Sequence, residues 1–172
     1  MEVRRPETDE EIRAPIRAHG LSWREAYDDI LPDAVLDEMT VDPIAEDVER
    51  WANGFGGDAA AVFVAVVDRT VEGFVDVRWG EENTKSFVGL DEADVKAIYV
   101  HPDCWGEGTG TALLERALDA LPDRVETVRL EALTDNDVGA QFYEARGFDR
   151  VDTDKTEIAG ETYPTGIYAR AI

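Results

Sequence analysis

The sequence is poor in lysine and in basic residues generally, and this shortage excludes one class of partner. Only three of its 172 residues are Lys, and 39 Asp and Glu stand against 17 Lys and Arg, which gives a formal charge of −22. Such a chain has no basic footprint for a phosphate backbone, so we expect no nucleic-acid partner. The acids are spread along the whole chain, as in proteins of salt-accumulating halophiles, and attraction of a cationic substrate is the alternative explanation.

Cysteine and long apolar runs are also scarce. The single cysteine, Cys104, excludes an internal disulfide and fits a reducing compartment. The longest apolar run, residues 59–67, is too short to span a bilayer, and the opening residues MEVRRPETDEE lack the apolar stretch of a secretory signal. We therefore expect a cytoplasmic protein that does not enter a membrane. Two histidines and one cysteine make no metal-ligand pattern, so we expect no metal.

Apolar periodicity predicts an α/β (α+β) chain. Strands are predicted at 2–5, 59–67, 71–79, 95–100, 124–133, 148–152 and 163–171. Pro15 is expected to disturb the first helix and Gly20 to interrupt it. The strand at 124–133 follows a helix and is expected to run parallel to the strand at 95–100. Alternation along that earlier strand predicts one shared face for Asp94, Lys96, Ile98 and Val100.

The most informative stretch is AIYVHPDCWGEGTGTALLERAL, residues 97–118. Three glycines at alternate positions, 106, 108 and 110, lie between a strand-like run and a helical apolar stripe. Glycine allows close approach of the backbone to a ligand, and a helix N-terminus offers free N–H donors, so this turn predicts a pyrophosphate site. A tight turn without a ligand is one alternative. A dinucleotide turn with Glu131 as its distant acid is another, but that pattern requires G-x-G-x-x-G, and a P-loop requires a Lys.

A second motif, TDNDVGAQFYEARGFDRV, follows the predicted strand at 124–133. Asp135 or Asn136 is expected to cap its helix and Gly147 to end it. The two motifs resemble motifs A and B of the GNAT N-acetyltransferase superfamily, [Q/R]-x-x-G-x-[G/A] after a strand and N-x-x-A-x-x-F-Y-E-x-x-G-F. Trp105 replaces the Gln/Arg and Gly139 replaces the Ala. The resemblance is strongest over residues 95–151.

The resemblance implies a single GNAT domain over residues 1–172, with a mixed, mostly antiparallel, twisted sheet of six to seven strands and helices on both faces. It also implies an acyltransferase that moves the acetyl group of acetyl-CoA to a primary amine by direct attack in a ternary complex. Tyr143 would be the general acid and the Val100 N–H the oxyanion donor. The implied cofactor-binding residues are Ile98, Tyr99, Val100, Trp105, Gly106, Gly108, Thr109, Gly110, Thr111, Asn136 and Tyr143.

Several points stay open at the level of sequence. The general base could be Glu92, Asp94, Glu131 or a water chain, and the acceptor could be a small-molecule or a peptide amine. Asn136 is equally explained as a helix cap, and Tyr143 as an aromatic packed against the sheet. The apolar tail at 163–172 permits a homodimer. A non-catalytic acyl-CoA sensor of the same fold and a nucleotide-binding oxidoreductase domain are the alternative functions.

Overall fold

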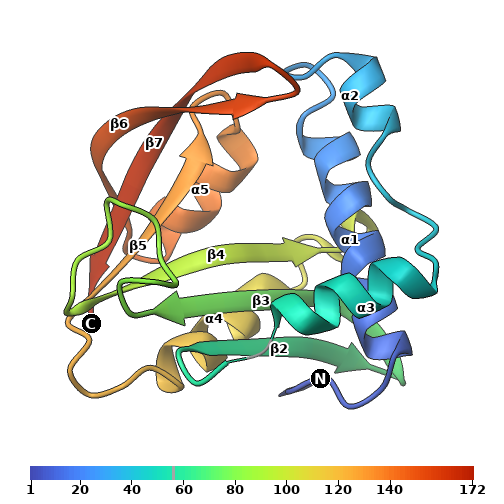
Figure 1. The fold of residues 1–172 in the computed structure, drawn as a ribbon, viewed down its shortest axis with the longest axis horizontal. Helices are drawn as coiled ribbons and strands as arrows, with labels where there is room; N and C mark the ends of the chain where they lie inside the picture. The colour runs from blue at the N-terminus through green and yellow to red at the C-terminus, as the bar shows by residue number, and fades with distance from the viewer. Residues whose placement is uncertain (56) are drawn as a thin grey trace.

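A computed structural model describes residues 1–55 and 57–172, which fold around one sheet (Figure 1). Its seven strands are β1 (Glu2–Arg4), β2 (Ala60–Val67), β3 (Thr70–Trp79), β4 (Glu92–Val100), β5 (Thr127–Leu133), β6 (Asp149–Ile158) and β7 (Glu161–Ala171). Their order across the sheet is β1-β2-β3-β4-β5-β7-β6. Only the β4–β5 pair is parallel. The predicted mixed, mostly antiparallel sheet and its parallel pair are confirmed.

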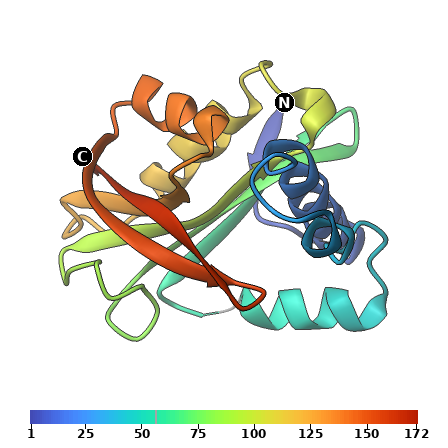
Figure 2. The same cartoon turned by 90° about the horizontal axis from the view of Figure 1, so that it is seen from above.

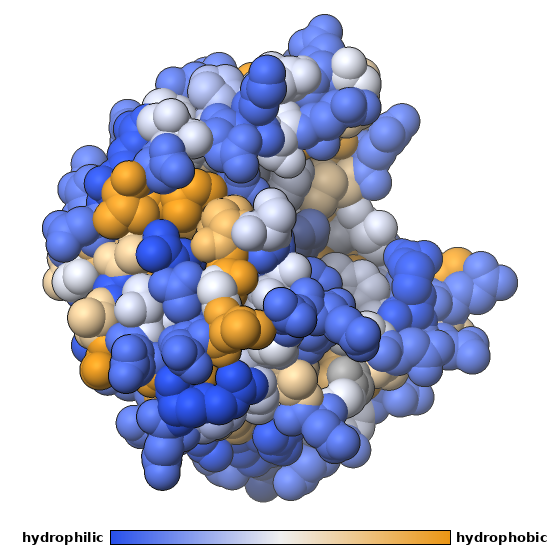
Figure 3. Space-filling view, turned by 60° about the vertical axis from the view of Figure 1, so that its left-hand side comes forward, coloured by the Kyte–Doolittle hydropathy of each residue, from blue (hydrophilic) through white to orange (hydrophobic). Residues whose placement is uncertain are grey.

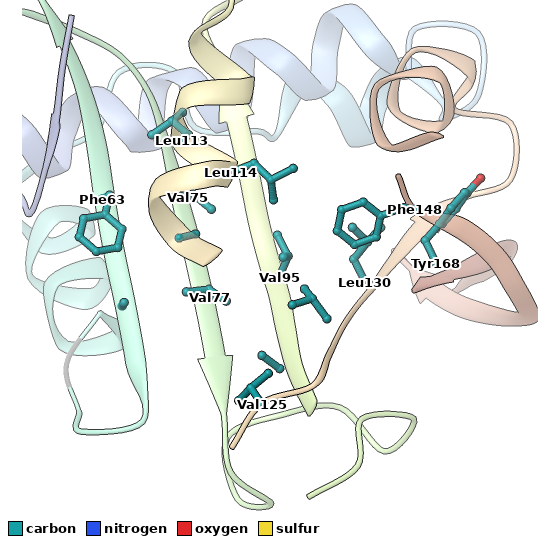
Figure 4. Packing of buried hydrophobic residues seen from close by; sticks show 14 of the residues in the cluster. Phe63, Val75, Val77, Val95, Leu113, Leu114, Val125, Leu130, Phe148 and Tyr168 are labelled. Carbon is teal, nitrogen blue, oxygen red and sulfur yellow. The ribbon is translucent and has the colours of Figure 1, made fainter. Parts of the chain in front are cut away.

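Helices cover both faces of this sheet (Figure 2). They are α1 (Glu10–Ala26), α2 (Asp33–Asp37), α3 (Ala45–Gly54), the 3-10 turn η1 (Pro102–Cys104), α4 (Thr109–Asp119) and α5 (Asp137–Ala145). On one face, Leu113 and Leu114 of α4 pack on Phe63, Val75 and Val95 in the main core (Figure 4). Each such fully buried side chain contributes roughly 1.5–3 kcal/mol by removal from water.

The opposite face of the sheet is aromatic. Phe74 of β3 and its cross-strand partner Tyr99 of β4 lie there, with ring centroids 5.9 Å apart. Trp51 of α3 contacts Phe74 edge-on at 5.7 Å, and His19 of α1 contacts Tyr99 edge-on at 4.7 Å. These contacts hold α1 and α3 against the face that α4 leaves uncovered.

Helix α1 differs from its prediction, because it runs without a break through both Pro15 and Gly20. Pro15 removes one backbone donor, but it is buried together with Ile16 and Ala18, and this packing outweighs the lost hydrogen bond. Gly20 permits close packing and does not end the helix. A Cβ at this position would lie 2.2 Å from the Thr40 carbonyl oxygen.

A bulge in β4 makes the alternation prediction wrong. Asp76 pairs with Ala97 and Val77 pairs with Val95, so Lys96 is the extra residue of the bulge. After the bulge, Ile98 and Val100 pack in the main core beneath α4. This is the same face of the sheet on which Val95 lies before the bulge. Asp94 and Ile98 therefore do not share a face, and Tyr99 lies on the α1 side.

The molecular surface is largely hydrophilic on the side shown in Figure 3, with a few apolar patches. Large exposed apolar side chains include Ile44, Leu90, Val138 and Val151. Among the described helices, none is both long and apolar enough to cross a membrane.

Candidate acetyl-CoA and acceptor sites

The sheet opens between its two parallel strands. β4 and β5 pair at only three positions, Glu92 with Thr127, Ala93 with Val128 and Asp94 with Arg129. After these positions β4 stays with β3 and β5 stays with β7, so the strands diverge (Figure 1). A cavity of about 470 Å³ lies along this opening, and we call it the first cavity. Every cofactor-binding residue implied by the sequence lines it, from Ile98 to Tyr143.

The exposed edge of β4 presents backbone groups to the first cavity. The His101 N–H donates to the Glu72 carbonyl at 2.6 Å, which extends the β3–β4 ladder by one hydrogen-bonded pair. Antiparallel pairs alternate between bonded and non-bonded, so Val100 opposite Gly73 and Ile98 opposite Val75 are non-bonded pairs. Their N–H and C=O groups point away from β3, towards the opening. A ligand with amide groups can pair with this edge as an added strand would.

Two side chains fix the end of β4. The Ser22 hydroxyl of α1 donates to the Val100 carbonyl at 2.7 Å, and the Trp105 indole N–H donates to the same oxygen at 2.8 Å. The Trp that replaces the family's Gln/Arg therefore holds the strand through its side chain. Ser22 was missed by the sequence reasoning, since no local pattern links a helix position to a strand 78 residues away.

The glycine turn forms an open cradle at the start of α4. Gly106 and Gly108 have φ of +81° and +87°, and a Cβ added at either would meet no heavy atom within 4 Å. The N–H groups of Thr109, Gly110 and Thr111 find no backbone carbonyl within the described ranges. Free donors, a positive helix end and open space in front of glycine suit a pyrophosphate.

Helix α5 closes the other side of this cradle. A Cβ at Gly110 would lie 2.8 Å from the Phe142 ring, so glycine is required for α4 to approach α5. Arg146 stacks over the Phe142 ring at 3.8 Å and donates through Nε to the Thr111 hydroxyl at 2.8 Å. Arg146 also lines the first cavity, which places a guanidinium beside the turn. Its position was visible in the second motif, but nothing in the sequence indicated that it would reach α4.

Asn136 and Tyr143 lie on the cavity wall formed by α5. The Asn136 side chain accepts the Gly139 N–H at 3.0 Å, so its predicted role as helix cap is confirmed. The Tyr143 ring packs against Phe148 and Tyr168, with centroids 5.9 Å and 6.1 Å away. Its hydroxyl bonds to none of the described residues, and burial raises the pKa of Tyr143 above its ordinary value of 10. The phenol therefore stays protonated at neutral pH and can donate a proton into the cavity.

Comparison with known proteins agrees with this geometry. The sequence model of the acetyltransferase (GNAT) domain matches residues 58–150, just over half of the chain. The chain belongs to the GNAT family. The ribosomal protein bS18-alanine N-acetyltransferase of Escherichia coli K12 is 39% identical over 79 residues, or 45% of this chain and 50% of that protein. The chain thus spans about half the length of the curated relatives it matches.

Solved structures share the GNAT fold over its full length. A PaiA N-acetyltransferase from Thermoplasma acidophilum, in complex with coenzyme A, superposes with a TM-score of 0.70 at 20% identity and covers all of both chains. A ribosomal-protein-alanine N-acetyltransferase from Brucella melitensis gives 0.73 at 18% identity, again over both whole chains. At these identities the likeness establishes the fold.

The one cysteine of this GNAT domain, Cys104, precedes the glycine turn and lines the first cavity. Burial, and then the nearby Glu72 and Glu107 carboxylates, raise the pKa of the Cys104 thiol. The thiolate is therefore disfavoured at neutral pH, which argues against a nucleophilic role. The ligand atoms of Glu72, Cys104 and Glu107 lie within 4.8 Å of one another. The buried Thr109 hydroxyl donates to Glu72 at 2.8 Å, so this carboxylate already has a structural partner.

A second cavity of about 560 Å³ lies on the aromatic face of the sheet. It is bounded by α1, α3 and the β6–β7 hairpin, and we call it the second cavity. The two cavities share a wall made of Tyr27, Lys96, Ala97, Tyr99, Glu131 and Ala132. Trp23 donates its indole N–H to the Tyr99 hydroxyl at 3.0 Å, and its ring contacts the Tyr27 ring edge-on at 4.9 Å.

The three candidate bases lie in different surroundings. Glu92 is bound to Arg129 at 2.8 Å and to the Gly89 N–H at 2.7 Å, at the closed end of the strand pair. Asp94 is 2% exposed, lines neither cavity, and burial raises its pKa. Glu131 alone of the three lines both cavities.

Proposed function

We propose that this GNAT domain, over residues 1–172, is an N-acetyltransferase that moves the acetyl group of acetyl-CoA to a primary amine by direct attack in a ternary complex. The observation that carries the proposal is the lining of the first cavity. Residues named from two separate motifs, together with the free edge of β4, converge on one opening in the sheet. A structural relative from Thermoplasma acidophilum holds coenzyme A, which supports the same ligand here.

The residues of the first cavity fit the parts of coenzyme A. The free N–H groups at the start of α4, with the Arg146 guanidinium beside them, would hold the pyrophosphate. The outward N–H and C=O groups of Ile98 would pair with the amides of the pantetheine arm. The Val100 N–H would then lie where an oxyanion develops, held there by the bonds of Ser22 and Trp105 to the Val100 carbonyl.

The reaction forms a C–N bond between the acceptor and the acetyl carbon and breaks the C–S bond of the thioester. The acceptor amine loses one proton, and the leaving sulfur gains one, so the products are an acetamide and a free thiol. Tyr143 is the proposed donor to sulfur, because its phenol is protonated and faces the cavity. It recovers its proton from solvent after the thiol forms.

Glu131 is the proposed carboxylate for the acceptor amine. It stands at the wall between the cavities, where an amine from the second cavity would approach the thioester in the first. Thr165 donates to its Oε2 at 2.7 Å and Lys85 to its Oε1 at 3.2 Å, so its orientation is fixed. An ammonium beside it would release its proton to this carboxylate, directly or through one water.

The test is release of thiol from acetyl-CoA on addition of amines. The protein would be incubated in molar KCl with acetyl-CoA and a panel of cationic, neutral and anionic amines, and the products checked by mass spectrometry. We expect amine-dependent thiol release with a mass gain of one acetyl group on the acceptor. Binding of acetyl-CoA without transfer to any amine would favour the acyl-CoA sensor instead.

A further inference from the structure

The second cavity differs in charge from the rest of the chain. Four cations line it, Arg50, Arg78, Lys85 and Lys96, against the three carboxylates Asp76, Glu131 and Glu157. The whole chain carries 17 basic and 39 acidic residues, and two of its three lysines lie in this lining. A cavity with this share of cations, in so acidic a chain, is suited to a ligand with an anionic group.

Lys96 is the cation best placed to meet such a ligand. It is the extra residue of the β4 bulge, and bulges redirect side chains next to functional sites. It borders both cavities and is exposed. Arg78 is bound to Asp76 at 2.9 Å, Arg50 to Asp47 at 2.9 Å and Lys85 to Glu131 at 3.2 Å. Lys96 has no carboxylate within ion-pair distance anywhere in residues 1–55 and 57–172.

Lys85 and Glu131 present opposite charges side by side at the shared wall. Their ammonium and carboxylate are 3.2 Å apart, and the Glu131 side chain is only 13% exposed. An α-amino acid also carries an ammonium and a carboxylate side by side, on one carbon atom. Its ammonium would face Glu131, towards the first cavity, while its carboxylate would face Lys85 and Lys96.

Aromatic side chains make up half of the uncharged lining of the second cavity. They are His19, Trp23, Tyr27, Trp51, Phe55, Phe74 and Tyr99. Burial lowers the pKa of His19 to about 4, so this ring is neutral at pH 7 and adds no charge to the wall. Aromatic faces in edge-on contact, as between Trp51 and Phe74, bind flat apolar groups well.

We propose that the acceptor is a free α-amino acid with an aromatic side chain, held by Lys96 and Lys85 at its carboxylate and by Glu131 at its amine. This inference rests on the proposed acetyl transfer. The amino-acid assignment also predicts which ligands bind without reaction, so the assignment and the transfer reaction can fail separately.

The test compares phenylalanine with phenylalaninamide, phenethylamine and a peptide amide that begins with phenylalanine. With acetyl-CoA present, we expect kcat/KM for phenylalanine to exceed that for each analogue without the carboxylate by at least tenfold. Lys96→Gln should lower this ratio at least fivefold. Lys155→Gln removes the one lysine that lines neither cavity and should leave the ratio unchanged. The amine of phenylalaninamide is less basic than that of phenylalanine, so a larger fraction of it is neutral and able to attack. Amine basicity alone would therefore favour the amide, which is opposite to the expected result.

Calorimetry with the protein saturated in coenzyme A supplies the second measurement. We expect phenylalanine to bind at least tenfold more tightly than phenethylamine, and Lys96→Gln to remove most of that difference. Acetyl transfer that prefers the amines without a carboxylate, or a ratio that Lys96→Gln does not change, overturns the amino-acid assignment and leaves the transfer reaction standing. Tight, Lys96-dependent binding of phenylalanine without any transfer supports the assignment and overturns the reaction.

Discussion

The two cavities lie on either side of one wall and differ in whether backbone or side-chain groups line them. The first consists largely of backbone: the edge of β4, the glycine turn and the N-terminus of α4. The second consists of aromatic and charged side chains from α1, α3, β3, β4, β5 and the β6–β7 hairpin. The first suits a ligand common to a whole family, because backbone groups do not vary with side-chain identity. The second suits a ligand particular to this chain.

We expect the greatest loss from a substitution in the glycine turn, which tests whether ligand binding in the first cavity depends on backbone groups. Gly108→Val would place a branched side chain where the φ is +87° and the space in front is open. We expect acetyl-CoA affinity to fall at least a hundredfold, equivalent to about 2.8 kcal/mol, measured by calorimetry. Gly160 has nearly the same φ, +85°, and equally open space, but it lies in the β6–β7 turn.

Gly160→Val is therefore the matched control for backbone strain. Both variants should lose a similar free energy of unfolding, of order 1–3 kcal/mol, and only Gly108→Val should lose the ligand. Tight acetyl-CoA binding by folded Gly108→Val would move the pyrophosphate away from this turn.

Tyr143→Phe tests the proposed proton donor of the first cavity. We expect kcat to fall by about 10²-fold with little change in acetyl-CoA affinity, because only the proton donor is lost. The raised pKa of Tyr143 also predicts that kcat shows no alkaline decline from this group below pH 10. Tyr163 lines neither cavity, and Tyr163→Phe should behave as the parent protein. An unchanged kcat for Tyr143→Phe at saturating amine would remove the phenol from the mechanism.

Glu131→Gln tests the wall between the cavities. We expect kcat/KM for the acceptor to fall by roughly tenfold at pH 7, because the amine loses its proton acceptor, with acetyl-CoA affinity preserved. Glu92→Gln supplies the control, since Glu92 is bound to Arg129 outside both cavities. Equal losses in the two variants would argue for a general effect of removing charge from the sheet.

The smallest expected effect concerns the stability of the aromatic face. The pKa of His19 is lowered to about 4 in the folded protein, against about 6.5 unfolded, so between these values the unfolded chain binds more protons. His19 therefore lowers the free energy of unfolding as pH falls from 7 to 5, by roughly 1–2 kcal/mol. Denaturant titrations at pH 7 and pH 5 should therefore show a smaller loss in the free energy of unfolding for His19→Gln than for the parent protein. Equal pH dependence of the free energy of unfolding in His19→Gln and in the parent protein would contradict this prediction.

The residues that line the first cavity could be named from the sequence because their determinants are local. The spacing of Gly106, Gly108 and Gly110 directly after a strand, and of Asn136 and Tyr143 on one helix, specifies the turn and the helix without knowledge of distant contacts. The seven-stranded sheet followed from the same local periodicities. What failed depended on packing: Gly20 is explained only by its contact with Thr40.

The second cavity could not be predicted for the same physical reason. Its lining joins residues from seven helices and strands and from the β3–β4 loop, and the bulge at Lys96 reverses the side-chain alternation after it. A bulge has no reliable signature in a single sequence, so strict alternation placed Lys96 on one face with Ile98 and Val100. The proposal of Glu131 among the candidate bases likewise depends on where β4 diverges from β5, because that opening forms the cavity that Glu131 lines.

The most direct test of the account is a calorimetric titration of the protein with acetyl-CoA in molar KCl, with NAD as the parallel ligand. We expect one site that binds acetyl-CoA and not NAD. Acetyl-CoA binding should be lost in Gly108→Val and retained in Gly160→Val. Absence of acetyl-CoA binding by a folded sample, or equal binding of NAD, would contradict it.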